Sequence, residues 1–225
     1  MARTPQPAGG NGSLRDIQVL INRYPERLNT KILEAFPAIS GSEIEWLSPL
    51  ENDGYAEYSD NDFIELLGLD PVEFNLGGFW PLRGPQWDAL GRTNLGEIIL
   101  VEAKANIPEV VSPGTFAEGG SRQQIEASLD ETKRYLGINN PNNWSGTFYQ
   151  YTNRIAHLYL FRILRERPAY LVNIYFTNDV TVSGPETEAE WRAALKVVKT
   201  YFGLSRHRLA KYMAELFFDV RELDI

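Results

Sequence analysis

The stretch PQWDALGRTNLGEIILVEAKAN at residues 85–106 decides the fold, because it reads as two strands joined by a tight turn. The expected strands are residues 86–92 and 97–105, and both are rich in apolar residues. They nevertheless carry three charged residues, namely Asp88, Glu102 and Lys104. Charged groups in half-buried strands need compensating partners, so these three residues are the first candidates for a functional site.

The alternation of side chains along a strand assigns these charges to faces. In residues 97–105, one face carries Ile98, Leu100, Glu102 and Lys104. If the turn centres on Leu95, Asp88 lies opposite Glu102, and a shift of two residues still leaves them diagonal neighbours on that face. Two facing carboxylates repel each other, and either Lys104 or a divalent cation would compensate their charge.

A second Glu-x-Lys tripeptide, Glu131 to Lys133, serves as an internal comparison. It lies in an expected helix, where residues two apart point in different directions. The Glu-x-Lys tripeptide at Glu102 therefore indicates a site only because it lies in a strand beside Asp88.

The rest of the chain predicts an α/β fold built on a mixed α+β sheet with helices on both faces. Apolar periodicity and capping residues predict helices at 13–28, 29–36, 59–69, 121–137, 148–166, 185–203 and around 205–214. Further strands are expected at 72–82, 169–178 and 215–220. Residues 72–82, 86–92 and 97–105 would form a three-strand antiparallel meander. The long helical connection to 169–178 predicts a parallel pairing with 97–105 through a right-handed crossover.

Composition places the chain among globular proteins. It has 225 residues, of which 43% are hydrophobic and 12% aromatic, and it has no cysteine. We expect a disordered tail at 1–12 and a single domain at 13–225, with a core at about 55–180 and helical additions at both ends. The tail lacks the apolar core of a secretory signal, and no apolar run reaches roughly 18 residues, so we expect no membrane partner. The cytoplasm is the default location for such a chain.

The net charge of −8 argues against binding nucleic acid by bulk attraction. A nucleic-acid partner would therefore need a local basic patch or a bound metal. Two separated histidines and the absence of cysteine argue against a zinc site.

Thirteen residues separate Asp88 from the Glu102-Ala103-Lys104 tripeptide on the next strand. This arrangement resembles the PD-(D/E)xK nuclease superfamily, whose restriction-endonuclease-like core has a helix, three antiparallel strands, a helix and a further strand. The resemblance covers roughly residues 55–180. One departure is Trp87, which stands where many members have proline.

The resemblance implies a metal-dependent nuclease that hydrolyses phosphodiester bonds in DNA. Asp88, Glu102 and the backbone carbonyl of Ala103 would hold Mg²⁺ or Mn²⁺, and Lys104 would position the attacking water. Either Glu65 or Glu57 would add a further ligand. The resemblance leaves a homodimer open.

The resemblance also implies a polar residue on the helix after the motif, where Gln123 and Gln124 stand beside Arg122. The next expected helix adds two candidate nucleic-acid contacts, Tyr151 and Arg154. The last two belong to YQYTNR at 149–154, where aromatic rings and arginine can stack on bases. The alternative for this segment is a helix packed on the sheet, with its tyrosine hydroxyls satisfied at the edge.

Two other functional interpretations stay open. The chain is a non-catalytic binding module that retains the nuclease fold, or it is an unrelated α/β protein. In the second case Asp88 and Glu102 would lie far apart or on opposite faces. A simple alternative for the three charges is an ordinary ion pair at the exposed end of a sheet.

Overall fold

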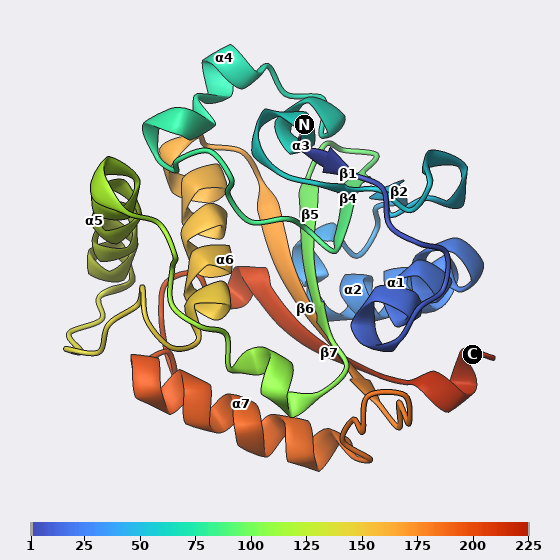
Figure 1. The fold of residues 1–225 in the computed structure, drawn as a ribbon. Helices are drawn as coiled ribbons and strands as arrows, with labels where there is room; N and C mark the ends of the chain where they lie inside the picture. The colour runs from blue at the N-terminus through green and yellow to red at the C-terminus, as the bar shows by residue number, and fades with distance from the viewer. Residues whose placement is uncertain (1, 225) are drawn as a thin grey trace.

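The computed structural model describes residues 2–224 and has a central mixed sheet in an α/β fold (Figure 1). In the described chain this sheet has five strands in the order β2-β4-β5-β6-β7. Their bounds are Ile44–Ser48, Ala89–Thr93, Ile98–Lys104, Ala169–Thr177 and Met213–Asp219. The pairings from β2 to β5 are antiparallel and those from β5 to β7 are parallel. The predicted parallel pairing of β5 with β6 is therefore confirmed.

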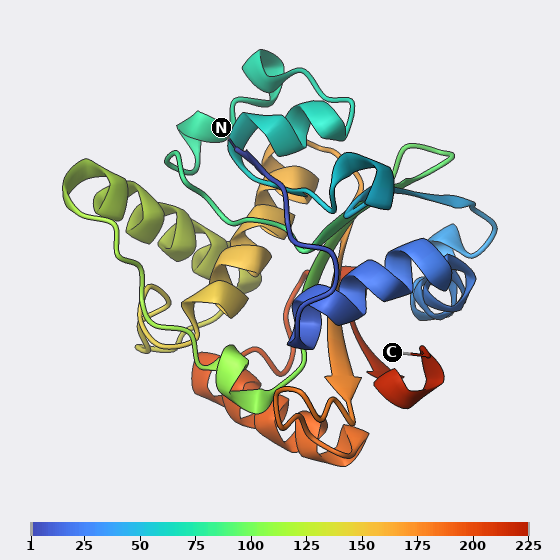
Figure 2. The ribbon, with the colours of Figure 1, turned by 45° about the vertical axis from the view of Figure 1, so that its right-hand side comes forward.

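Helices cover both faces of the sheet, as the sequence predicts (Figures 1 and 2). Helices α1 (Gly12–Arg23) and α2 (Pro25–Ala35) lie on one face. Helices α6 (Tyr149–Tyr159) and α7 (Glu188–Phe202) lie on the other, and α5 (Gly119–Leu136) packs against α6. The short helices α3 (Asp60–Leu66) and α4 (Pro71–Phe74) close one end of this second layer.

Two hydrophobic cores form on the two faces because β5 alternates its side chains between them. Ile98 and Leu100 belong to the core under α6 and α7, whereas Ile99 and Val101 belong to the core under α1 and α2. All four side chains are buried, as expected for a central strand. The first face then changes from apolar residues to Glu102, which places a charge at the end of a core.

The third antiparallel strand differs from the prediction. Residues 72–82 form α4 and a 3-10 turn at Leu76–Gly78, and β2 takes the place expected for them beside β4. The carboxylate of Asp70 accepts hydrogen bonds from the Val72 and Glu73 amides, so a local cap starts a helix in this segment.

Two predicted helices also differ from the structure. The helix expected within 13–28 ends at Arg23, before Pro25 as the sequence indicates. The second helix, expected at 29–36, already starts at Pro25, because proline suits the first turn of a helix. The helix expected around 205–214 is reduced to a 3-10 turn at Ala210–Tyr212, and β7 begins at Met213.

The N-terminal segment differs from the expected disordered tail at 1–12. Strand β1 (Arg3–Thr4) pairs with β3 (Glu57–Tyr58), and the Gln6 amide donates to the Gly54 carbonyl at 3.1 Å. Arg3 also forms a 2.6 Å ion pair with Asp53. These contacts are non-local, so the polar composition of the segment could not reveal them.

None of the helices within residues 2–224 combines the length and the apolar character that crossing a membrane requires.

A buried pair of aspartates joins α1 to the loop after β6. One Arg15 nitrogen lies 2.6 Å from Asp16 Oδ1 and 3.2 Å from Asp179 Oδ1, and the Thr181 hydroxyl donates to Asp179 Oδ1 at 2.6 Å. The Oδ2 atom of each aspartate is buried and has no hydrogen-bond partner within residues 2–224. Burial raises the pKa of Asp16 to about 7, whereas Thr181 and Arg15 outweigh burial and lower the pKa of Asp179.

Asp16→Asn is expected to stabilise the protein at pH 8. Because the folded state raises the pKa of Asp16, the carboxyl favours folding when it is protonated, and stability falls as pH rises from about 4 to about 7. The amide removes that cost, so the free energy of unfolding at pH 8 should increase by about 2 kcal/mol, or roughly 4–8 °C in Tm. Thermal unfolding at pH 5 and pH 8 measures the change, with exposed Asp130→Asn as the control. A loss of stability at pH 8 would contradict the prediction.

Candidate active site

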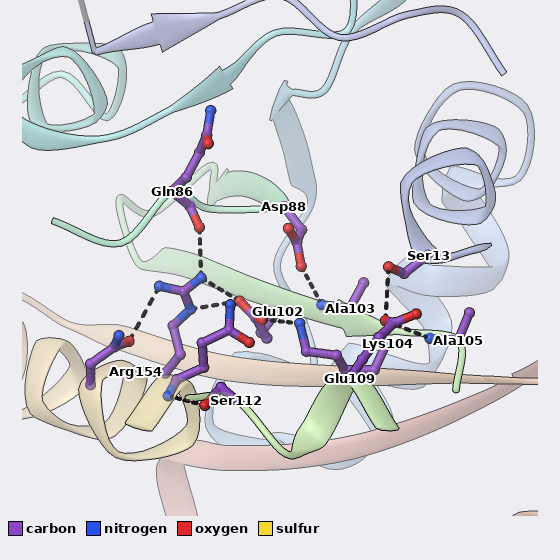
Figure 3. A network of polar contacts seen from close by, with 12 residues as sticks. Ser13, Gln86, Asp88, Glu102, Ala103, Lys104, Ala105, Glu109, Ser112 and Arg154 are labelled. Carbon is purple, nitrogen blue, oxygen red and sulfur yellow. Dashed lines mark hydrogen bonds and ion pairs between the residues drawn. The ribbon is translucent and has the colours of Figure 1, made fainter. Parts of the chain in front are cut away.

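The β4–β5 hairpin brings Asp88 beside Glu102, as the predicted register requires. Ala89 pairs with Val101 and Leu90 pairs with Leu100, so Asp88 lies immediately before the paired part of β4. Its Oδ2 atom accepts a 2.7 Å hydrogen bond from the Ala103 amide (Figure 3). The amide and carbonyl of one strand residue point toward the same neighbouring strand, so the Ala103 carbonyl faces the side of β5 where Asp88 lies.

Glu102 is buried and forms ion pairs through both of its oxygens. Lys104 Nζ lies 2.5 Å from Oε1, and the Arg154 guanidinium donates to Oε2 from Nε at 2.6 Å (Figure 3). Burial opposes ionisation of Glu102, but the charges of Arg154 and Lys104 outweigh it and lower the pKa of the carboxyl. Glu102 is therefore a carboxylate with a fixed orientation.

Arg154 reaches this site from α6 and is only 4% exposed. Its Nη2 atom donates to the Gln86 carbonyl at 2.6 Å, and its guanidinium lies 4.6 Å from the centre of the Trp87 ring. Arg154 thus joins Glu102 to the segment that leads into Asp88. The sequence presents Arg154 as a nucleic-acid contact. In the structure its guanidinium borders the cavity but already donates to Glu102 and to the Gln86 carbonyl.

Asp88 and Glu57 are carboxylates whose charge is poorly compensated. Burial, followed by the charge of Glu102, raises the pKa of Asp88 to about 7. Burial, followed by the charge of Asp88, raises the pKa of Glu57 to about 8. For Lys104, burial favours the neutral amine, but Glu102 and Asp88 outweigh it and raise the pKa. The site combines a well-paired carboxylate with two that form no ion pair within residues 2–224, although Arg154 lies near enough to act on both.

The structure distinguishes the two candidates for the additional acidic residue. Glu57 lies on β3 and lines the same cavity as Asp88, Glu102 and Lys104. Its Oε2 atom accepts a 3.0 Å hydrogen bond from the Gln6 side chain, which the N-terminal segment supplies. Glu65 is exposed on α3 and does not line this cavity.

The cavity has a volume of about 1050 Å³ and lies above the end of β5. Its walls come from the segment between α4 and β4, the loop before α5, and the first turns of α5 and α6. This volume is at the upper end of the roughly 300–1,000 Å³ of pockets for small molecules. Carboxylates outnumber cations in the lining, which has Glu57, Asp88, Glu102, Glu109 and Glu118 against Arg83, Lys104 and Arg154.

The predicted contacts on α5 lie outside the cavity. Arg122 forms a 2.9 Å ion pair with Glu126, Gln124 donates to the Gly77 carbonyl at 2.7 Å, and Gln123 is exposed. The cavity is instead lined from this helix by Ser121 and Ile125.

On α6 the cavity is lined by Tyr149, Gln150, Asn153 and Arg154, whereas Tyr151 packs against the hydrophobic core. Residues three and four apart share a helix face, so the spacing of these four residues identifies the inner face. Sequence reasoning that treats Tyr149, Tyr151, Asn153 and Arg154 of this segment as one cluster does not separate Tyr151 from the inner face, and it misses Gln150.

The donor set fits a cation only in part. Asp88 and Glu57 line one cavity and have no ion-pair partner in the described part of the chain, and a hard divalent cation prefers such carboxylate oxygens. Against this, Glu102 is already paired through both oxygens, and residues 2–224 contain no group of three acidic, histidine or cysteine side chains arranged to hold a metal. A cation would therefore bind mainly through Asp88 and Glu57, beside the Ala103 carbonyl.

Comparison of the chain with protein-family models, curated proteins and solved structures finds no match.

Proposed function

We propose that the protein is a metal-dependent nuclease with a restriction-endonuclease-like fold that hydrolyses phosphodiester bonds in DNA. The observation that carries this proposal is the pairing of Asp88 with the Glu102-Ala103-Lys104 tripeptide across one hairpin. The order of β4, β5 and the parallel β6 supports the fold assignment, with β2 as the third antiparallel strand.

The residues of the site suit the separate tasks of phosphodiester hydrolysis. Asp88 and Glu57 would hold Mg²⁺ or Mn²⁺, with Glu102 and the Ala103 carbonyl beside them. When bound, such a cation polarises the scissile phosphate and lowers the pKa of a water molecule. Lys104 would orient the attacking water and stabilise negative charge that develops on the phosphoryl oxygens. Arg154 would keep Glu102 ionised and fixed while these groups act.

One observation favours a second candidate, the non-catalytic binding module. Because Lys104 and Arg154 both pair with Glu102, the charge of Glu102 is compensated without a metal ion. In that function the cavity would bind a ligand and leave it intact. Asp88 and Glu57 argue for the nuclease, because a binding site that needs no cation would not benefit from two buried, poorly compensated carboxylates.

Cleavage of single- and double-stranded DNA and RNA in Mn²⁺ or in EDTA tests the proposal. We expect wild type to cleave only with the metal, and Lys104→Ala to lose on the order of 100-fold in rate or more. Lys133→Ala, from the Glu-x-Lys on α5, is the matched control and should cleave like wild type. Cleavage that survives in Lys104→Ala would contradict the assignment, and binding without cleavage would favour the binding module.

A further inference from the structure

The rim of the acidic cavity carries apolar side chains that face solvent. Leu82 is 77% exposed, Val111 is 55% exposed and Phe116 is 86% exposed, and all three line the cavity. Scattered surface hydrophobic residues are common and need no explanation. Here three exposed apolar residues from two separate segments surround one polar site, which indicates a ligand with apolar surface.

Specific contacts hold Leu82 at the rim. The carboxylate of Asp60, at the start of α3, accepts hydrogen bonds from the Arg83 amide at 3.0 Å and from the Gly84 amide at 2.9 Å. Arg83 itself has a φ of 64°, in the left-handed region that non-glycine residues seldom occupy. The turn is therefore fixed in a conformation that leaves Leu82 in solvent.

Similar contacts hold the loop that carries Phe116. The Thr115 amide donates to the Ser145 carbonyl at 2.9 Å, and the Gln150 amide donates to the Ser112 hydroxyl at 3.0 Å. Gly114 lies so close to Ser145 that an added Cβ would be 2.7 Å from its carbonyl oxygen. The loop is pinned along its length, so Phe116 is presented to solvent by an ordered backbone.

The cavity has too few free cations to bind a duplex through its phosphates, so its charge favours a ligand bound through its bases. Three cations line it, but Lys104 and Arg154 are paired with Glu102, which leaves Arg83 as the remaining lining cation among the described residues. A duplex is bound largely through several Lys or Arg contacts to phosphates, and the chain has a net charge of −8. Single strands are bound in addition by stacking of bases on aromatic side chains, a contribution that does not depend on phosphate contacts and that Phe116 at the rim can supply.

We infer that the cavity takes an unpaired nucleic-acid strand, with its bases against Leu82 and Phe116 and its backbone directed at the carboxylates. This inference rests on the proposed function, because it names the substrate class of the same site. The cavity volume of about 1050 Å³ agrees with this occupant, since it encloses a few nucleotides and not a length of double helix.

Fluorescence anisotropy of a labelled single strand and of the matching duplex tests the inference. The measurements use full-length protein in Ca²⁺, with electrophoresis to show that the probe stays intact. We expect wild type to bind the single strand at least about fivefold more tightly than the duplex, and Leu82→Ala and Phe116→Ala each to weaken single-strand binding at least about fivefold. Leu95→Ala is the matched control, because Leu95 is 73% exposed but lies outside the cavity, in the β4–β5 turn.

The outcomes separate this inference from the nuclease proposal. Equal binding of duplex and single strand, or unchanged single-strand binding by both variants, would overturn the inference. If such a protein still cleaves duplex with a requirement for Lys104, the nuclease proposal stands alone. If wild type cleaves nothing but binds single strands through Leu82 and Phe116, the inference stands and the nuclease proposal fails.

Discussion

Asp88→Asn is expected to reduce Mn²⁺-dependent cleavage on the order of 1,000-fold without unfolding the protein. The amide keeps the size of the side chain and an oxygen that can accept the Ala103 hydrogen bond, but it removes the charge that would bind the cation. Single-turnover cleavage rates measure the loss. Asp130→Asn on α5 is the control, because this aspartate is exposed and lies outside the cavity.

The stability of the same variant is a second readout. Burial and the charge of Glu102 raise the pKa of Asp88 to about 7, so the ionised carboxylate opposes folding at pH 8. Asp88→Asn should therefore keep or increase the free energy of unfolding, by about 1 kcal/mol. A variant that loses both activity and stability would show that Asp88 supports the fold and would not assign it to catalysis.

Arg154→Met is expected to lower the free energy of unfolding by about 3–5 kcal/mol. The substitution keeps an unbranched side chain but leaves Glu102 with one ion pair in a buried site and removes the donor to the Gln86 carbonyl. Urea denaturation measures the loss. Arg122→Met is the matched control, because the exposed pair of Arg122 with Glu126 should contribute at most about 1 kcal/mol.

A double variant identifies the cause of that destabilisation. Glu102→Gln combined with Arg154→Met removes the carboxylate that has lost one of its two ion pairs, and the charge of Asp88 still acts on Lys104. The double variant should therefore regain about half of the lost stability while remaining inactive. If Arg154→Met has the same free energy of unfolding as wild type, the ion pair of Arg154 with Glu102 does not stabilise the contact of α6 with β5 in solution. If the double variant is no more stable than Arg154→Met, the loss comes from packing against Trp87 and not from the charge of Glu102.

The sequence was sufficient for the hairpin and the three central charges. Apolar alternation and the short turn fix the register of β4 and β5, because a slip by one residue would move a whole apolar face into solvent. The sequence also predicts the fully buried β6, because a long run of branched and aromatic residues is typical of a central strand.

Other features depend on contacts that a local pattern does not contain. The segment 72–82 has strand-forming residues, but the cap at Asp70 and the proline after it start a helix instead. Glu57 lies on β3, which pairs with β1 at the start of the chain. The Gln6 side chain, from the same N-terminal segment, donates a hydrogen bond to the Glu57 carboxylate. Arg154 pairs across 52 positions with Glu102, which no spacing within α6 could indicate.

Calorimetric titration of Mn²⁺ into the protein at pH 8, without nucleic acid, tests the central claim most directly. The claim is that Asp88 and Glu57 are kept beside Glu102 to hold a divalent cation, and this measurement does not depend on finding the right substrate. We predict one site per chain in wild type and in Asp130→Asn, and loss of that site in Asp88→Asn and in Glu57→Gln. Equal Mn²⁺ binding by all four proteins, or no binding by wild type, would contradict the account.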